Sequence, residues 1–152
     1  MNAFFFDSSA IVKNYVAETG TAWVQTLIDT PTNRVYIARI SGAEVVAAFV
    51  RRTRGNAISA SDAGIAIRKF RYDFRSKFIL VDVSHALIQL AMTLAETHGL
   101  RGYDAVQLAA ATETNDFRLM RKLSALTLIA ADAELLDAAK VEGVQTDDPN
   151  NH

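Results

Sequence analysis

Short apolar runs separated by longer helical segments limit what this chain can fold into. Four runs have the composition and length of buried strands: Ala3–Phe6, Arg34–Ala38, Phe78–Val83 and Leu126–Ala130. Val144-Gln145 is a candidate for a short fifth strand. Parallel strands need long crossover connections, which are usually helices. The alternation therefore predicts an α/β fold.

Helical periodicity and capping signals occupy the intervals between these runs. The expected helices are Ser8–Ala17, Thr21–Asp29, Ser41–Arg54, Ser59–Lys77, Ser84–His98, Asp104–Leu123 and Asp132–Glu142. This order predicts three α/β/α layers around a mostly parallel central sheet of four or five strands. We expect one domain over residues 1–149 and a short tail at 150–152. The segment Thr146–His152 is polar and aperiodic, so we expect it to be loose.

The composition narrows the class of protein further. The 152 residues include no Cys, which excludes a disulfide scaffold and a thiolate metal site. No apolar run approaches the roughly 18 residues that span a bilayer, and no basic segment precedes the apolar residues before Asp7. We therefore expect a cytoplasmic protein with no membrane partner. A net charge of −1 argues, taken alone, against a nucleic-acid partner.

Four acidic residues stand where strands pass into helices. Asp7 directly follows the first strand, and Asp132 follows the fourth. Glu44 and Asp104 lie in the first turns of two helices. Because ligands of parallel sheets bind beyond the carboxyl ends of the strands, these positions suggest one shared site. Clustered carboxylates raise one another's pKa, and a hard cation such as Mg²⁺ or Mn²⁺ offsets that repulsion.

Each acid also has a structural interpretation that the sequence leaves open. Ser41-Gly-Ala-Glu44 has the spacing of a capping box, in which Glu44 would accept the Ser41 N–H. Asp7, Asp104 and Asp132 occupy positions typical of helix N-caps. Four separate caps need not converge, and the sequence alone does not show whether these four acids do.

The residues around these acids form four motifs in a characteristic order. They are Phe4-Phe5-Phe6-Asp7-Ser8-Ser9, Ser41-Gly42-Ala43-Glu44-Val45, Tyr103-Asp104-Ala105-Val106-Gln107-Leu108 and Leu128-Ile129-Ala130-Ala131-Asp132, with Gly143 beyond. Over roughly residues 2–149 the chain thereby resembles the PIN domain family, and within it the VapC-type toxins of toxin–antitoxin pairs. Ala130 departs from the pattern, since the family often has Ser or Thr there. This leaves open whether Asp132 contacts a metal directly.

The resemblance implies a metal-dependent endoribonuclease with Mg²⁺ as its cofactor and Mn²⁺ as a substitute. Asp7 and Asp104 are the expected direct ligands. Glu44 and Asp132 would hold a second ion or its waters, or orient the attacking water. Hydrolysis would leave a 5′-phosphate and a 3′-hydroxyl. Ser8 or Ser9 would support Asp7, or would only begin the helix.

The resemblance also implies a set of partners. RNA would be the substrate, and a cognate antitoxin protein would inhibit the chain. The chain itself would form a homodimer. DNA would be contacted only indirectly, through the antitoxin.

Two other functions are consistent with parts of the pattern. A haloacid-dehalogenase-type phosphatase also begins with an apolar strand ending in Asp, and Asp7 would then be the nucleophile. Those enzymes usually carry a second Asp two residues on, where this chain has Ser9. A PIN-like module that binds RNA or protein without cutting is the non-enzymatic alternative.

The near-neutral total hides an uneven distribution of charge. Residues 51–77 contain eight Lys and Arg against two Asp, a net charge of +6, while the remainder has eight against fifteen, a net charge of −7. The basic residues are Arg51, Arg52, Arg54, Arg68, Lys69, Arg71, Arg75 and Lys77. Such a stretch can bind phosphates or can be a solvated helix face.

The remaining notable side chains have structural interpretations. No two of the histidines at 85, 98 and 152 have metal-ligand spacing. Met92 and Met120 are expected in the core. Trp23 is expected to be buried, although an apolar patch near it and Tyr15 is a second interpretation, as an antitoxin surface.

Overall fold

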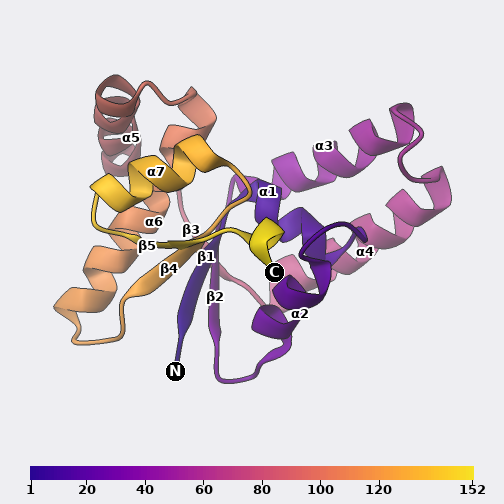
Figure 1. Ribbon diagram of the computed structural model, residues 1–152, viewed down its shortest axis with the longest axis horizontal. Coiled ribbons are helices and arrows are strands. Elements are labelled where there is room, and N and C mark those ends of the chain that lie inside the picture. Colours follow the sequence, from indigo (N-terminus) through magenta and orange to yellow (C-terminus); the bar gives the residue numbers. More distant parts are fainter.

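The computed structural model describes all residues 1–152 and is built on a five-stranded parallel sheet with helices on both faces (Figure 1). The strands are β1 (Ala3–Phe6), β2 (Arg34–Ala38), β3 (Ile79–Val81), β4 (Leu126–Ile129) and β5 (Gln145–Asp147). Their order across the sheet is β3-β2-β1-β4-β5, and every pairing is parallel. The predicted three-layer α/β/α architecture is confirmed.

Strand β1 lies at the centre of the sheet and ends level with β4. Phe6 pairs with Ile129, and the Asp7 N–H continues the ladder by donating to the Ile129 carbonyl at 3.1 Å. The residues that follow β1 and β4 therefore leave the sheet side by side at its carboxyl edge, which is where parallel sheets bind ligands.

Two apolar cores lie on opposite faces of the sheet. Successive strand residues point to opposite faces, so Phe5 joins one core while Phe6 joins the other, and both are fully buried. One face is covered by α5 (His85–His98), α6 (Gly102–Met120) and α7 (Ala133–Val141). The other is covered by α1 (Ser8–Ile11), α2 (Thr21–Asp29), α3 (Ser41–Arg54) and α4 (Ala60–Ser76). Figure 1 shows α3 and α4 projecting as a pair beyond the sheet.

The first helix is shorter than the predicted Ser8–Ala17. α1 ends at Ile11 and continues as the 3-10 helix η1 (Val12–Asn14). The tighter turn lets the buried Lys13 amine donate to the Thr19 carbonyl at 2.9 Å. The Tyr15 hydroxyl donates to Asp73 on α4 at 2.7 Å. Contacts with these other segments, rather than local helical periodicity, fix this conformation.

The expectation that Thr146–His152 is loose is wrong. Gln145–Asp147 forms edge strand β5, and Pro149–Asn151 forms a 3-10 helix, η2. Asn150 Oδ1 accepts a hydrogen bond from Lys13 Nζ at 3.0 Å. The His152 ring stacks on half-buried Trp23 with the ring centroids 4.0 Å apart. These partners lie far away in sequence, so periodicity did not reveal them.

Met92 and Met120 are not in the core as predicted, because their side chains are 63% and 77% exposed. Met92 lies on the outer face of α5, and Met120 is the last residue of α6. The third strand is also shorter than Phe78–Val83, since the Phe78 N–H donates to the Asp73 carbonyl at the end of α4 instead of joining the sheet. No helix is both long enough and apolar enough to cross a bilayer.

We expect Gly20→Ala to destabilise the fold more than Gly143→Ala. Both glycines have positive φ, which costs a residue with Cβ about 1–2 kcal/mol. A Cβ at Gly143 meets no atom within 4 Å, whereas one at Gly20 overlaps the Pro149 carbonyl. Overpacking adds about 1–3 kcal/mol. Equilibrium urea unfolding of the two variants measures the difference, and equal losses would mean that η2 does not pack against the start of α2.

Candidate active site

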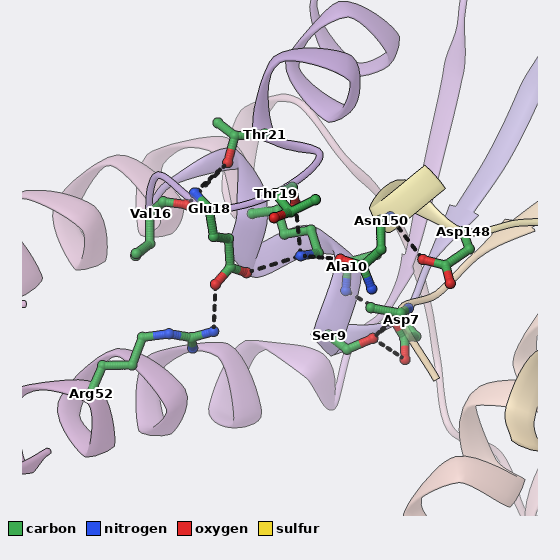
Figure 2. A network of polar contacts seen from close by, with 12 residues as sticks. Asp7, Ser9, Ala10, Val16, Glu18, Thr19, Thr21, Arg52, Asp148 and Asn150 are labelled. Atoms are coloured by element: carbon green, nitrogen blue, oxygen red, sulfur yellow. Dashed lines mark hydrogen bonds and ion pairs between the residues drawn. The ribbon is translucent and has the colours of Figure 1, made fainter. Parts of the chain in front are cut away.

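Asp7 is buried at the end of the central strand and holds its carboxylate by local hydrogen bonds. Its side chain is the N-cap of α1, with Oδ1 accepting from the Ala10 N–H at 2.9 Å. The Ser9 hydroxyl donates to Oδ1 at 2.7 Å and lies 2.9 Å from Oδ2 (Figure 2). The N-cap interpretation of Asp7 is therefore confirmed, and so is the supporting contact from Ser9.

Ser9 also connects the ends of the two central strands. Its Oγ accepts from the Ala131 N–H at 3.0 Å, just after β4. Asp132 follows as the N-cap of α7, with Oδ1 accepting from the Glu134 and Leu135 N–H groups at 2.9 and 3.3 Å. The cap uses one oxygen of Asp132, and Oδ2 has no hydrogen-bond partner.

The capping box predicted for Ser41 and Glu44 is wrong. The N-cap of α3 is Ile40, with no side-chain hydrogen bond. The Ser41 hydroxyl instead accepts from Gln107 Nε2 of α6 at 2.9 Å. Glu44 Oε1 is buried without a hydrogen-bond partner. A buried carboxylate oxygen without a partner is costly, which marks Glu44 as a group in need of a ligand.

Asp104 is not a helix cap either. α6 begins at Gly102, its N-cap Arg101 makes no side-chain cap bond, and Asp104 lies half-buried in the first turn. No hydrogen bond engages its carboxylate. Of the four candidate acids, Asp7 and Asp132 are caps with free acceptor capacity, while Glu44 Oε1 and the Asp104 carboxylate have no hydrogen-bond partner.

The four carboxylates act on one another electrostatically. Burial, and then the charges of Asp104 and Asp132, raise the pKa of Asp7 to about 7 against the hydrogen bonds from Ser9 and Ala10. Burial also raises the pKa of Glu44 to about 7, with Asp7 and Asp104 adding to the effect, while a hydrogen bond from Ser8 and the charge of Arg51 oppose it.

Asp104 shares this environment. Its pKa is raised by burial and then by Asp132, while Arg101 opposes the shift. Each of the four acids is coupled to at least one other, so the structure brings all four predicted site residues to one edge of the sheet.

The four carboxylates are suitable ligands for a divalent cation, although their oxygens do not converge on one point in this structure. No group of three His, Cys, Asp or Glu residues is spaced to hold a metal ion as the side chains stand. The unpartnered Oε1 of Glu44 and the raised pKa values of Asp7 and Glu44 nevertheless favour a bound cation, because negatively charged oxygen ligands bind Mg²⁺ and Mn²⁺. The three histidines lie outside this group, with His98 hydrogen-bonded to Glu142 at 2.6 Å.

Gln107 is a buried member of the site that the sequence interpretation did not single out. Besides Ser41, its Nε2 lies 3.5 Å from Ser8 Oγ, so it links α6 to α3 and α1. Its own Oε1 is buried without a partner. The available signal was an amide on an otherwise apolar face, one turn after Asp104. Gln107 thereby links α1, which Asp7 caps, to α3 and α6, which carry Glu44 and Asp104.

The parallel sheet and the acids at its carboxyl edge define a PIN-domain protein. Comparison with known sequences agrees. The chain is 34% identical over 116 residues to Ribonuclease VapC45 and, equally, to Ribonuclease VapC49 of Mycobacterium tuberculosis, covering 76% of this chain and 79% of each relative. It therefore belongs to the VapC ribonuclease family. No model of a known protein family matches the chain.

Solved structures share the fold at low sequence identity. PAE2754 from Pyrobaculum aerophilum superposes with a TM-score of 0.64 at 19% identity, covering 99% of this chain and 91% of that one. VapBC2 from Rickettsia felis, bound to a promoter DNA fragment, gives 0.62 at 13% identity with 96% and 98% coverage. VapC20 from Mycobacterium tuberculosis, a toxin that cleaves the sarcin–ricin loop, gives 0.60 at 14% identity with 89% and 94% coverage.

Without divalent cations, we expect the fold to lose stability as the pH rises. Asp7 has a pKa near 3.8 when unfolded and about 7 when folded, so the folded state binds its proton more tightly. That contribution is complete below about pH 4 and is lost as the pH rises through about 7. Thermal unfolding in chelator should give a Tm that falls over this range.

The matched variants are Asp7→Asn and Asp116→Asn. Asn does not ionise, so Asp7→Asn should make the dependence of Tm on pH shallower, while the raised pKa of Glu44 keeps part of it. Asp116 is exposed on α6, away from the site, and its variant should follow the wild type. A wild-type Tm that rises between about pH 4 and 7 would contradict the burial of Asp7.

Proposed function

We propose that this chain is a Mg²⁺-dependent endoribonuclease, with Mn²⁺ as a substitute, and the toxin of a toxin–antitoxin pair. The observation that carries the proposal is the convergence of Asp7, Glu44, Asp104 and Asp132 at the carboxyl edge of the sheet, with Glu44 Oε1 lacking a partner. Membership in the VapC ribonuclease family supports RNA as the substrate.

The four acids take different roles in this proposal. Asp7 and Asp104 are assigned as direct ligands, because Asp7 is oriented by Ser9 and Ala10 and the Asp104 carboxylate has no partner. Asp132 is assigned to hydrating waters or a second ion through the oxygen that its cap leaves free.

Glu44 is the assigned general base. Its unpartnered Oε1 would accept the proton of the attacking water, and a pKa near 7 suits a base at neutral pH. A divalent cation at the site supplies Lewis acidity toward the phosphoryl oxygens and positive charge against the carboxylates. We assign hydrolysis that leaves a 5′-phosphate and a 3′-hydroxyl.

The proposal extends to partners and location. A cognate antitoxin would inhibit the enzyme, which is supported by the likeness in fold to VapBC2. The chain would act as a cytoplasmic homodimer, and DNA would be bound by the antitoxin rather than by this chain. The phosphatase alternative lacks its second acid, since Ser9 occupies that position and donates to Asp7.

We expect Asp104→Asn to lower RNA cleavage by more than about 100-fold, because it removes a direct metal ligand. Substitution of residues that only support metal ligands typically costs about 10- to 100-fold. The matched control is Asp116→Asn, which removes an exposed carboxylate from the same helix and should cleave at the wild-type rate. The measurement is cleavage of a structured RNA pool in Mg²⁺ or Mn²⁺, followed by mapping of the RNA ends.

Three outcomes separate the candidate functions. Cleavage that stops with chelator and in Asp7→Asn supports the nuclease. A folded wild-type protein that binds RNA but never cuts it supports the non-catalytic module. A phosphoryl group attached covalently to Asp7 supports the phosphatase.

We expect expression of the chain alone to arrest growth and co-expression of the cognate antitoxin to restore it. The physical reason is that a partner covering the acidic site excludes RNA from it. Growth curves of cells carrying the wild type, with Asp104→Asn as the inactive control, measure the effect. Arrest that is equally strong with Asp104→Asn would show that toxicity does not come from cleavage.

A further inference from the structure

A cavity of about 350 Å³ adjoins the proposed active site between α1–η1 and α3. Its walls include Ser8 and Glu44 on the side of the acids and Arg51 and Arg52 on the opposite side. Glu44 therefore belongs both to the carboxylate site and to this cavity. A molecule that reaches the acids through the cavity passes the two arginines.

The face of α3 sets the spacing between acid and arginine. Residues seven or eight apart lie two turns along the same helix face, so Glu44 and Arg51 are separated by about 10 Å along the axis at 1.5 Å per residue. Ala48 lies between them and also lines the cavity. A small residue there leaves the path between the two charges open.

The cations around the cavity differ in whether they are already paired. Lys13 is buried and donates to Thr19 O and Asn150 Oδ1 at 2.9 and 3.0 Å, and it lies 3.4 Å from Glu18 Oε1. Its donors are used within the fold. Lys13 is therefore a positioning residue for Glu18 and not a site for an external anion.

Glu18 in turn holds Arg52, with Oε2 of Glu18 3.4 Å from Arg52 Nη2 (Figure 2). Arg51 is exposed and has neither an ion pair nor a hydrogen bond to its side chain. Three cations against two acids leave the cavity with a net charge of +1. Arg51 is thus the one cation of the three with all of its donors free.

We propose that this cavity binds a backbone phosphate of the RNA next to the scissile one, with Arg51 as its principal ligand and Arg52 held beside it by Glu18. This rests on the proposed ribonuclease function. A chain with a phosphate at every nucleotide can occupy the acidic end and the arginine end together, and Arg binds phosphate in a bidentate manner. An acidic side chain of the antitoxin is the competing occupant, and it would pair with Arg51 without reaching the carboxylates at the other end of the cavity.

The test compares Arg51→Ala with Arg54→Ala. Arg54 is exposed in the last turn of the same helix and does not line the cavity. In an Asp104→Asn background, which prevents cleavage, fluorescence anisotropy measures binding of a labelled single-stranded RNA that carries the mapped cut site. We expect Arg51→Ala to weaken binding about tenfold, typical of a lost charged hydrogen bond.

The salt dependence gives a readout specific to a phosphate contact. Loss of one contact should reduce the slope of log K against log salt concentration by about 0.7 for single-stranded nucleic acid. Arg51→Lys keeps the charge and should restore the slope. In the active enzyme, Arg51→Ala should raise KM and leave kcat nearly unchanged, and Arg54→Ala should match the wild type in every measurement.

The outcomes distinguish this inference from the proposed function. If the wild type cleaves RNA but Arg51→Ala retains the wild-type slope and KM, the phosphate site is refuted and the nuclease stands. If Arg51→Ala leaves RNA binding intact but weakens inhibition by the antitoxin, the occupant is an antitoxin carboxylate and the inference fails. If the wild type neither cuts nor binds RNA, both proposals fall.

Discussion

Asp7 carries its carboxylate at the end of a strand that is buried on both sides, by Phe5 toward one core and Phe6 toward the other. Burial of a charge is unfavourable unless it is paired and hydrogen-bonded. Ser9 and the Ala10 N–H supply hydrogen bonds, but the neighbouring acids act in the opposite direction. The structure around the carboxyl edge thus holds negative charge in place without neutralising it. A cation is the simplest chemical group that resolves this imbalance.

The sequence predicted those features that depend on residues close to one another along the chain. The apolar runs identified four of the five strands, and Val144-Gln145 was a candidate for the start of the fifth, β5. The caps at Asp7 and Asp132 follow from the rule that Asp accepts the first free N–H groups of a helix. The capping box at Glu44 failed because Gln107, far away in sequence, takes the Ser41 hydroxyl. Local spacing shows which bonds are available, but it does not show which distant group competes for them.

The residues near the end of the chain illustrate the same limit. Asn150 and His152 look unstructured in isolation, yet one receives a hydrogen bond from Lys13 and the other stacks on Trp23. Both partners lie in the first helices, and only the fold brings them together. The exposed side chain of Met92 shows the converse, because an apolar residue in a helical pattern need not face the core.

The net charge of −1 is a poor guide to ligands because it averages over regions that a phosphate would meet separately. Glu44 and Arg51 are separated by about 10 Å along α3, and the screening length at physiological ionic strength is about 8 Å. The two charges still act on each other, because Arg51 lowers the pKa of Glu44. A polyanion with a phosphate at every nucleotide can meet Arg51 at one phosphate while the acids at the sheet edge act mainly on whatever cation they hold. The two-turn spacing on α3 places both ends of this path along one helix face.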